Sequence, residues 1–128
     1  MTISRLVRSG FLVVLVAGAG CSSTHIVPEA GSPEYADTDA ARVQLIPWAP
    51  NRPYERLGEV IVEPAPSASW QEVDLELRNA AADLGGHAMY VVWDPSKRYS
   101  VVQVDPVESD RRSHYPPNGI VAVVIRFK

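Results

Sequence analysis

A helix that ends at two glycines and continues as an apolar strand, over residues 69–93, limits the folds open to this chain more than any other segment. Ser69 followed by Glu72 fits a capping box, in which the two side chains satisfy backbone N–H groups of the first turn. Gly85 and Gly86 favour a left-handed C-cap, because glycine has no Cβ to clash in that conformation. The apolar side chains recur every three or four residues, as on the buried face of an α-helix: Trp70, Val73, Leu77, Ala80, Ala81 and Leu84.

After the glycines the apolar pattern changes to that of a strand. Residues 88–93 are apolar throughout and rich in β-branched and aromatic side chains, as in a strand that is buried on both faces. Gly58 lies inside another predicted strand and indicates a bulge or a close backbone approach. The other predicted strands cover residues 43–46, 56–62, 99–104 and 120–127. The order (β)-β-α-β-β-β predicts an α+β fold, with one amphipathic helix packed on a small mixed β-sheet.

The length and the charge of the chain restrict its organisation and its partners. Its 128 residues are enough for one domain. The net charge is −3, and a chain that starts at Cys21 lacks Arg5 and Arg8, which leaves 10 basic against 15 acidic residues and a net charge of −5. Because an acidic surface repels phosphate backbones, we expect no nucleic acid partner.

Residues 1–20 have the features of an export signal peptide. Arg5 and Arg8 form a positive n-region, and the apolar run at residues 11–17 is shorter than the roughly 20 residues that span a bilayer. The sequence Gly18-Ala19-Gly20-Cys21 resembles a bacterial lipobox, in which the cysteine is acylated and becomes the first residue of the mature protein. Ordinary signal-peptidase cleavage after Ala19 is the alternative. By similarity to lipoprotein sorting in enteric-type bacteria, Ser22 implies the outer membrane, with the protein facing the periplasm.

Residues 21–42 are predicted to be a lipidated cysteine and a flexible tether, and residues 43–128 a globular domain. The tether prediction rests on composition, since small, polar and acidic residues dominate without a sustained apolar period. A peptide that binds a partner is the alternative for this segment. Cys21 is the only cysteine, so its acylation would leave the domain without a thiol for a disulfide or a metal site.

Part of the chain resembles a known family. Residues 57–60 (LGEV) precede the predicted helix, and residues 81–89 (AADLGGHAM) lead from it into a strand. This β-α-β core, at residues 56–93 together with the lipobox, is similar to small bacterial outer-membrane lipoproteins of the RcsF type and to related domains proposed to bind heavy metals. The run typical of them is Ala-x-x-Leu-Gly-Ala-Asp-Ala, from which this chain differs at Gly86 and His87. The resemblance implies a stress-sensing or structural role in the cell envelope, while the disulfides of RcsF-type domains have no counterpart here.

The three histidines are scattered along the chain. His25 lies in the predicted tether, His87 at the corner between helix and strand, and His114 in a long polar loop. A zinc site needs three or four converging ligands, usually with short sequence spacings. We therefore predict no metal and no cofactor, and His87 and His114 are only weak candidates for metal ligands.

No arrangement typical of catalysis stands out. The chain has no Ser-His-Asp order, Gly-rich phosphate loop or Gly-x-Ser-x-Gly motif, so we expect that it is not an enzyme. The polar face of the predicted helix carries carboxylates that would either remain solvated near the helix N-terminus or hold a hard cation. They are Glu72, Glu76 and Asp83, next to Asn79.

Two regions are candidates for contact with a partner. Trp48 lies among prolines, and the loop at residues 105–119 contains Arg111, Arg112 and Tyr115. Long loops in compact domains are often functional. We expect a non-enzymatic envelope lipoprotein that is held to the membrane through Cys21 and binds another envelope protein or self-associates. The rival hypothesis is a periplasmic module that binds a metal or a small ligand.

Overall fold

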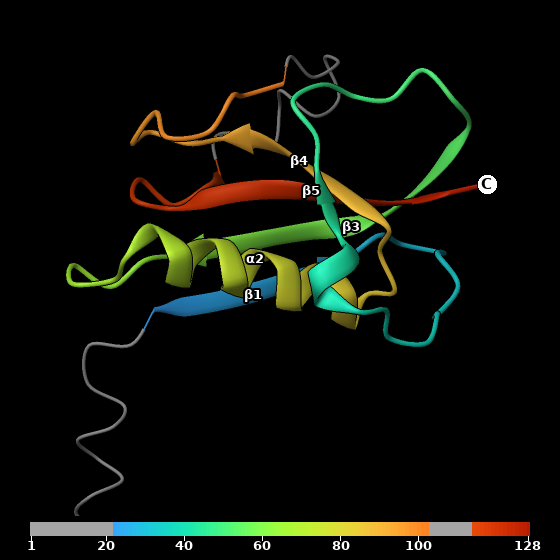
Figure 1. Ribbon diagram of the computed structural model, residues 1–128, viewed down its shortest axis with the longest axis horizontal. Helices are drawn as coiled ribbons and strands as arrows, with labels where there is room; N and C mark the ends of the chain where they lie inside the picture. Colours follow the sequence, from blue (N-terminus) through green and yellow to red (C-terminus); the bar gives the residue numbers. More distant parts are fainter. Residues whose placement is uncertain (1–21, 103–113) are drawn as a thin grey trace, which may run out of the picture.

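The computed structural model describes residues 22–102 and 114–128, which form a five-stranded mixed β-sheet with one α-helix across one of its faces (Figure 1). The predicted α+β fold, with one helix on a mixed sheet, is confirmed. The order of elements is β-β-β-α-β-β, with one strand more before the helix and one fewer after it than predicted. The elements are β1 (Ser23–Pro28), the 3₁₀ helix η1 (Ala40–Arg42), β2 (Gln44–Leu45), β3 (Tyr54–Glu63), α2 (Trp70–Asp83), β4 (Ala88–Trp93) and β5 (Ile120–Phe127).

The strands lie in the order β1-β3-β5-β4-β2 across the sheet. Strands β3 and β4 both pair antiparallel with the central β5, β1 pairs antiparallel with β3, and β2 pairs parallel with β4. Helix α2 therefore connects two strands that run in the same direction on either side of β5. In the described residues, no helix has the length and apolar character needed to cross a membrane.

Helix α2 begins and ends where its capping residues predict. The Ser69 hydroxyl oxygen accepts the N–H of Glu72 at 3.2 Å, and the hydroxyl donates to the Glu72 carboxylate at 3.3 Å. Gly85 has the positive φ of 79°, and the N–H of Gly86 donates to the carbonyl of Ala81 at 2.9 Å. These bonds form a Schellman motif, which satisfies carbonyls at the end of the helix.

Hydrophobic clusters lie on both faces of the sheet. Burial of the central strands on both faces explains why β4 and β5 are apolar almost throughout, as predicted. On the helix side the buried residues include Val73, Leu77, Ala80, Ala81, Val60, Val62, Met89, Val91 and Val124. On the other side they are Ala88, Tyr90, Val92, Val102, Val121, Val123 and Ile125.

The structure differs from the flexible tether that we predicted for residues 21–42. Strand β1 pairs with β3 along its whole length, from Ser23 opposite Glu63 to Pro28 opposite Gly58. Further along, the Thr38 hydroxyl donates to a backbone carbonyl beyond the end of α2 at 2.7 Å. An edge strand buries little apolar surface and is held by backbone pairing, so its sequence needs no hydrophobic period. Cys21 and the predicted signal peptide lie outside the described residues.

The structure also corrects the prediction of a strand at residues 99–104. Residues 99–102 form no strand, and residues 103–104 lie outside the described residues. The buried carboxylate of Asp94 accepts the N–H groups of Ser96, Arg98 and Tyr99 at 3.0, 2.8 and 2.8 Å, which folds the chain into a turn. Within residues 99–102, one backbone hydrogen bond, from the Val102 N–H to the Val91 carbonyl on β4 at 2.8 Å, resembles strand pairing.

Candidate functional site

Strand β1 is an open edge of the sheet. All six of its residues are exposed, and Ile26 and Val27 keep 37% and 48% of their surface accessible. Alternate backbone N–H and C=O groups of an edge strand point away from the sheet and can pair with another strand. The opposite edge is much shorter, since β2 has two residues and Pro47 follows soon after. Of the two edges, β1 therefore offers the longer docking surface for an extended segment.

Side-chain and backbone contacts hold β1 against the rest of the domain. The hydroxyl of Thr24 donates to the carboxylate of Glu76 on α2, and the imidazole of His25 lies 3.9 Å from the carboxylate of Glu63 on β3. Gly58 on β3 lets the two strands approach closely, because a Cβ there would lie 2.5 Å from the Val27 carbonyl oxygen. The register also shifts between Arg56 and Gly58, so the predicted bulge and close approach at Gly58 are confirmed.

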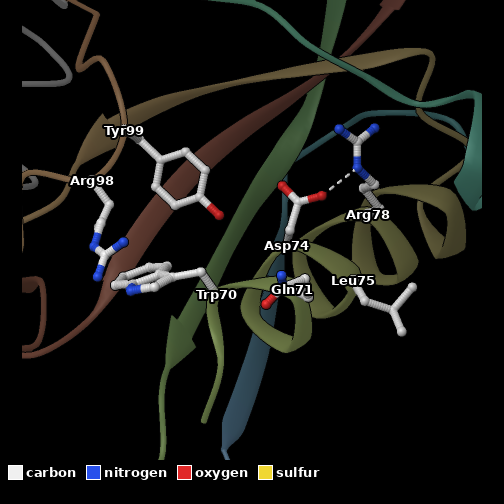
Figure 2. A pocket seen from close by; sticks show the side chains of 7 residues that line it. All are labelled: Trp70, Gln71, Asp74, Leu75, Arg78, Arg98 and Tyr99. Carbon is white, nitrogen blue, oxygen red and sulfur yellow. Dashed lines mark hydrogen bonds and ion pairs between the residues drawn. The ribbon is translucent and has the colours of Figure 1, made fainter.

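A hollow of about 580 Å³ lies between α2 and the segment after β4 (Figure 2). The rings of Trp70 and Tyr99 meet edge to face, with their centroids 5.9 Å apart, and the guanidinium of Arg98 lies 4.6 Å from the centre of the Trp70 ring. Burial, followed by the nearby carboxylates of Asp74 and Asp94, raises the pKa of Tyr99 to about 12. Tyr99 therefore stays neutral at physiological pH.

The charged groups of this hollow are already engaged. Asp74 accepts a hydrogen bond from the Arg78 guanidinium at 2.7 Å, and Arg78 also donates to the carbonyl of Val43. Arg98 is stacked on Trp70. The arrangement stabilises the turn after β4 against the helix. The sequence did not reveal this cluster, because Tyr99 was predicted to lie in a strand at residues 99–104.

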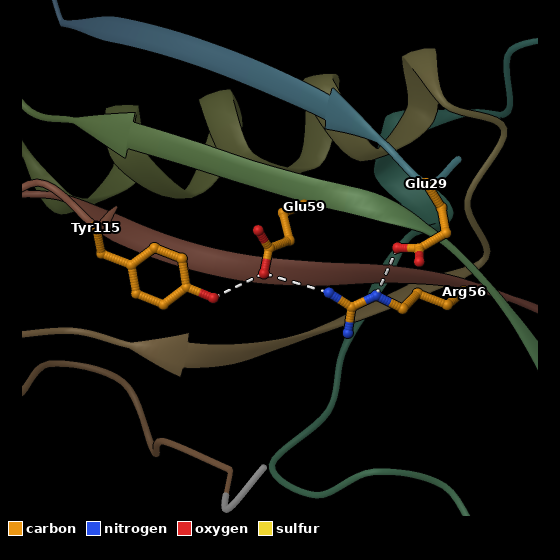
Figure 3. A network of polar contacts seen from close by, with 4 residues as sticks. All are labelled: Glu29, Arg56, Glu59 and Tyr115. Atoms are coloured by element: carbon orange, nitrogen blue, oxygen red, sulfur yellow. Dashed lines mark hydrogen bonds and ion pairs between the residues drawn. The ribbon is translucent and has the colours of Figure 1, made fainter. Parts of the chain in front are cut away.

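A second polar cluster lies on the sheet face opposite the helix (Figure 3). The guanidinium of Arg56 lies between two carboxylates, at 2.9 Å from Glu29 and 3.2 Å from Glu59. The hydroxyl of Tyr115 donates to Glu59 at 2.7 Å. Glu59 is 5% exposed, and burial of a carboxylate is costly unless such hydrogen-bond and ion-pair partners compensate it. The cluster joins the segment after β1, strand β3 and the segment before β5.

The imidazole of His87 has a defined hydrogen-bonding role. Its Nδ1 accepts the N–H of Phe127 at 3.0 Å, which places the proton of the neutral ring on Nε2. Burial, followed by the nearby cations of Arg126 and Arg52, lowers the pKa of His87. A metal ion at Nδ1 would have to displace the backbone N–H, and one at Nε2 would have to displace the proton.

The structure separates most of the predicted site residues. Trp48 is 65% exposed and lines a hollow of about 700 Å³ that also contains His87. His114 lines a different hollow, together with the half-buried Tyr115, so the two histidines are not brought together. Arg111 and Arg112 lie outside the described residues.

Metal-ligating side chains do not converge in residues 22–102 and 114–128, where no group of three or more His, Cys, Asp or Glu residues could hold a metal ion. Two carboxylates on the predicted polar face of α2 accept hydrogen bonds within the protein. Glu72 takes part in the N-terminal cap, and Glu76 accepts the Thr24 hydroxyl.

Sequence reasoning missed the edge strand and the Glu59 cluster. A signal for the second was present, since Glu59 stands directly before the apolar residues 60–62 of its strand. The first had only a short signal, the β-branched residues Thr24, Ile26 and Val27, and it is the pairing with β3 that identifies β1 as a strand. Comparison with known proteins adds no assignment: no protein-family model, curated protein or solved structure matches this chain.

Proposed function

We propose that this protein is a non-enzymatic cell-envelope lipoprotein, anchored through acylated Cys21, whose small α+β domain binds another envelope protein. The observation that carries the proposal is the open edge of the sheet at β1, which has six exposed residues and two exposed aliphatic side chains. Natural sheets commonly protect such edges with lysine, proline or very short strands. Here Pro28 stands only at the end of the strand, and β1 contains no lysine.

The edge suits a partner segment that is extended and partly apolar. Adding a strand to β1 would pair the backbone groups of the two chains, while Ile26 and Val27 would contact alternate apolar side chains on the two faces of the partner strand. The lipobox at Cys21 and the residue Ser22 support an outer-membrane protein that faces the periplasm. The resemblance to RcsF-type lipoproteins supports a stress-sensing or structural role.

The rival hypothesis, binding of a metal or a small ligand, has less support. His87 uses Nδ1 for the backbone of Phe127, and His114 lines a separate hollow. In the hollow between Trp70 and Tyr99, the Asp74 carboxylate is paired with Arg78, and the Arg98 guanidinium lies over the Trp70 ring.

Photo-crosslinking in intact cells tests the proposal. A photoreactive amino acid replaces Val27 in the full-length protein, and the same replacement at Val101 is the control, since the two valines have similar exposures of 48% and 44%. We expect a discrete adduct with one envelope protein at position 27 and none at position 101.

Three results would contradict this proposal. An adduct of twice the mass of this chain would show self-association instead of a separate partner. Absence of any adduct at position 27, or the same adducts at both positions, would show that the β1 edge is not the docking surface.

A further inference from the structure

We infer that the lipid-anchored domain stands end-on on the bilayer, with the end of the sheet where β1 begins facing the lipid headgroups. The inference depends on the proposed acylation of Cys21. The hydroxyl oxygen of Ser22 accepts the backbone N–H of Ala65 at 2.9 Å, and β1 begins at Ser23. Because consecutive Cα atoms are about 3.8 Å apart, Cys21 lies within one residue of the folded domain. Only Ser22 therefore separates the lipidated Cys21 from β1, so the anchor restricts the orientation of the domain.

The strand pairing defines which surface would meet the membrane. Ser23 lies opposite Glu63 at the end of β3, Val62 lies opposite Ile120 at the start of β5, and Val121 lies opposite Trp93 at the end of β4. The start of β1 is therefore at the same end of the sheet as the segments at residues 64–69, 94–99 and 116–119, on the left of Figure 1. We call these three segments the anchor end.

The side chains of the anchor end suit a phospholipid surface. Lys97 and Arg98 are exposed there, and ammonium and guanidinium groups bind phosphate oxygens. Trp70 lies beside Arg98 and combines an apolar ring with a polar N–H, as residues at membrane interfaces commonly do.

The carboxylates near this end are engaged within the protein. Asp94 is buried and accepts backbone N–H groups, Glu72 accepts the Ser69 hydroxyl, and Glu63 lies 3.9 Å from His25. Of these three carboxylates only Asp94 is buried and lies in the anchor end, so Lys97 and Arg98 are the exposed charges of its three segments.

End-on contact places the two ends of the sheet at very different heights. Strand β3 has ten residues, which span about 33 Å at the usual rise of a β-strand. Residues at the opposite end, such as Asp37 and Asn51, would lie about that far from the headgroups, and the β1 edge would stand upright and open to lateral approach.

Fluorescence quenching in proteoliposomes tests this orientation. The full-length acylated protein is placed in vesicles of phosphatidylethanolamine and phosphatidylglycerol that carry nitroxide-labelled headgroups. Single variants Ser67→Cys and Asn118→Cys label the anchor end, and Asp37→Cys and Asn51→Cys label the opposite end. Because Cys21 is the only native cysteine, its acylation leaves the introduced thiol as the single site for the fluorophore.

We expect quenching at positions 67 and 118 to be several-fold greater than at positions 37 and 51. Insertion of about ten Gly and Ser residues between Cys21 and Ser22 should largely remove this difference, because a flexible linker lets the domain tumble. Equal quenching at both ends of the uninserted protein, or greater quenching at positions 37 and 51, would overturn the orientation alone. Mass spectrometry that finds Cys21 unmodified would overturn the proposed anchor as well.

Discussion

Leu77 and Leu75 are close together on α2 but differ completely in burial, at 0% and 55% exposed. Leu77→Ala should lower the free energy of unfolding by about 2–5 kcal/mol, because it removes buried methyl groups and leaves a cavity against the sheet. Leu75→Ala, the control, should change it by less than about 0.5 kcal/mol. Denaturant unfolding measures both values, and equal losses would contradict the packing of α2 described above.

Glu59 is the residue whose loss should most disturb the face opposite the helix. Glu59→Ala leaves the Tyr115 hydroxyl and one side of the Arg56 guanidinium without this partner, which should lower the free energy of unfolding by roughly 1–3 kcal/mol. The loss is limited because Arg56 keeps its bond to Glu29. Glu63→Ala, at a more exposed carboxylate on the same strand, is the control for denaturant unfolding and should have little effect. Similar losses in the two variants would show that the buried cluster contributes little.

His87 should make stability depend on pH. Its pKa in the folded protein lies below the ordinary value of 6.5, first because of burial and then because of Arg126 and Arg52. Above about pH 6.5 the ring is neutral in both the folded and the unfolded chain, so it does not change the free energy of unfolding with pH there. As the pH falls below 6.5, the unfolded chain takes up the proton more readily, and the free energy of unfolding decreases until the pH falls below the pKa of the folded protein.

The measurement for His87 is denaturant unfolding between about pH 5 and pH 8. His87→Asn, whose side-chain oxygen can still accept the Phe127 N–H, should reduce this pH dependence. If the free energy of unfolding depends on pH equally in His87→Asn and in the unchanged protein, the pH dependence comes from other groups.

At the scale of elements, Gly58 controls the attachment of β1. Gly58→Ala should separate β1 from β3, because the added Cβ would lie 2.5 Å from the Val27 carbonyl oxygen. Gly31→Ala is the control, since that glycine also has a positive φ but has no atom within 4 Å of an added Cβ. We expect faster amide hydrogen exchange in β1 of Gly58→Ala, with β5 remaining protected, and no such change in Gly31→Ala. Unchanged protection of β1 in Gly58→Ala would show that the strand pairing tolerates the side chain.

At the scale of the whole molecule, the anchor restricts how copies of the chain can meet. Antiparallel pairing of two β1 strands would place the two Ser23 residues at opposite ends of a six-residue pair, about 20 Å apart. Two domains that stand end-on on one bilayer both point the start of β1 at the membrane, so they cannot pair in this way.

We therefore predict that a photoreactive residue at Val27 gives no adduct of twice the chain mass when the acylated protein is in vesicles. An unanchored chain that begins at Ser22 and is free in solution is the comparison, because it has no such restriction. Formation of the doubled adduct in vesicles would show either that the domain does not stand end-on or that two upright β1 strands pair in parallel.

Local sequence alone specifies α2, its two caps, and strands β4 and β5, whose predicted ranges agree with the structure. The helix follows from an apolar repeat between Ser69 and Gly85, and β4 and β5 follow from apolar runs long enough to be buried on both faces. These signals are carried by neighbouring residues, so they can be read without knowing what the segment packs against.

The tertiary structure decides the parts that have no local signal. Strand β1 is held mainly by backbone bonds to residues 58–63, the burial of Glu59 depends on Arg56 and Tyr115, and the three segments of the anchor end meet only because β5 pairs with both β3 and β4. Each of these features joins residues that are far apart in the chain or that show no periodic pattern. Small, polar and acidic residues dominate the composition of residues 22–42, whereas pairing with β3 makes their first part a strand.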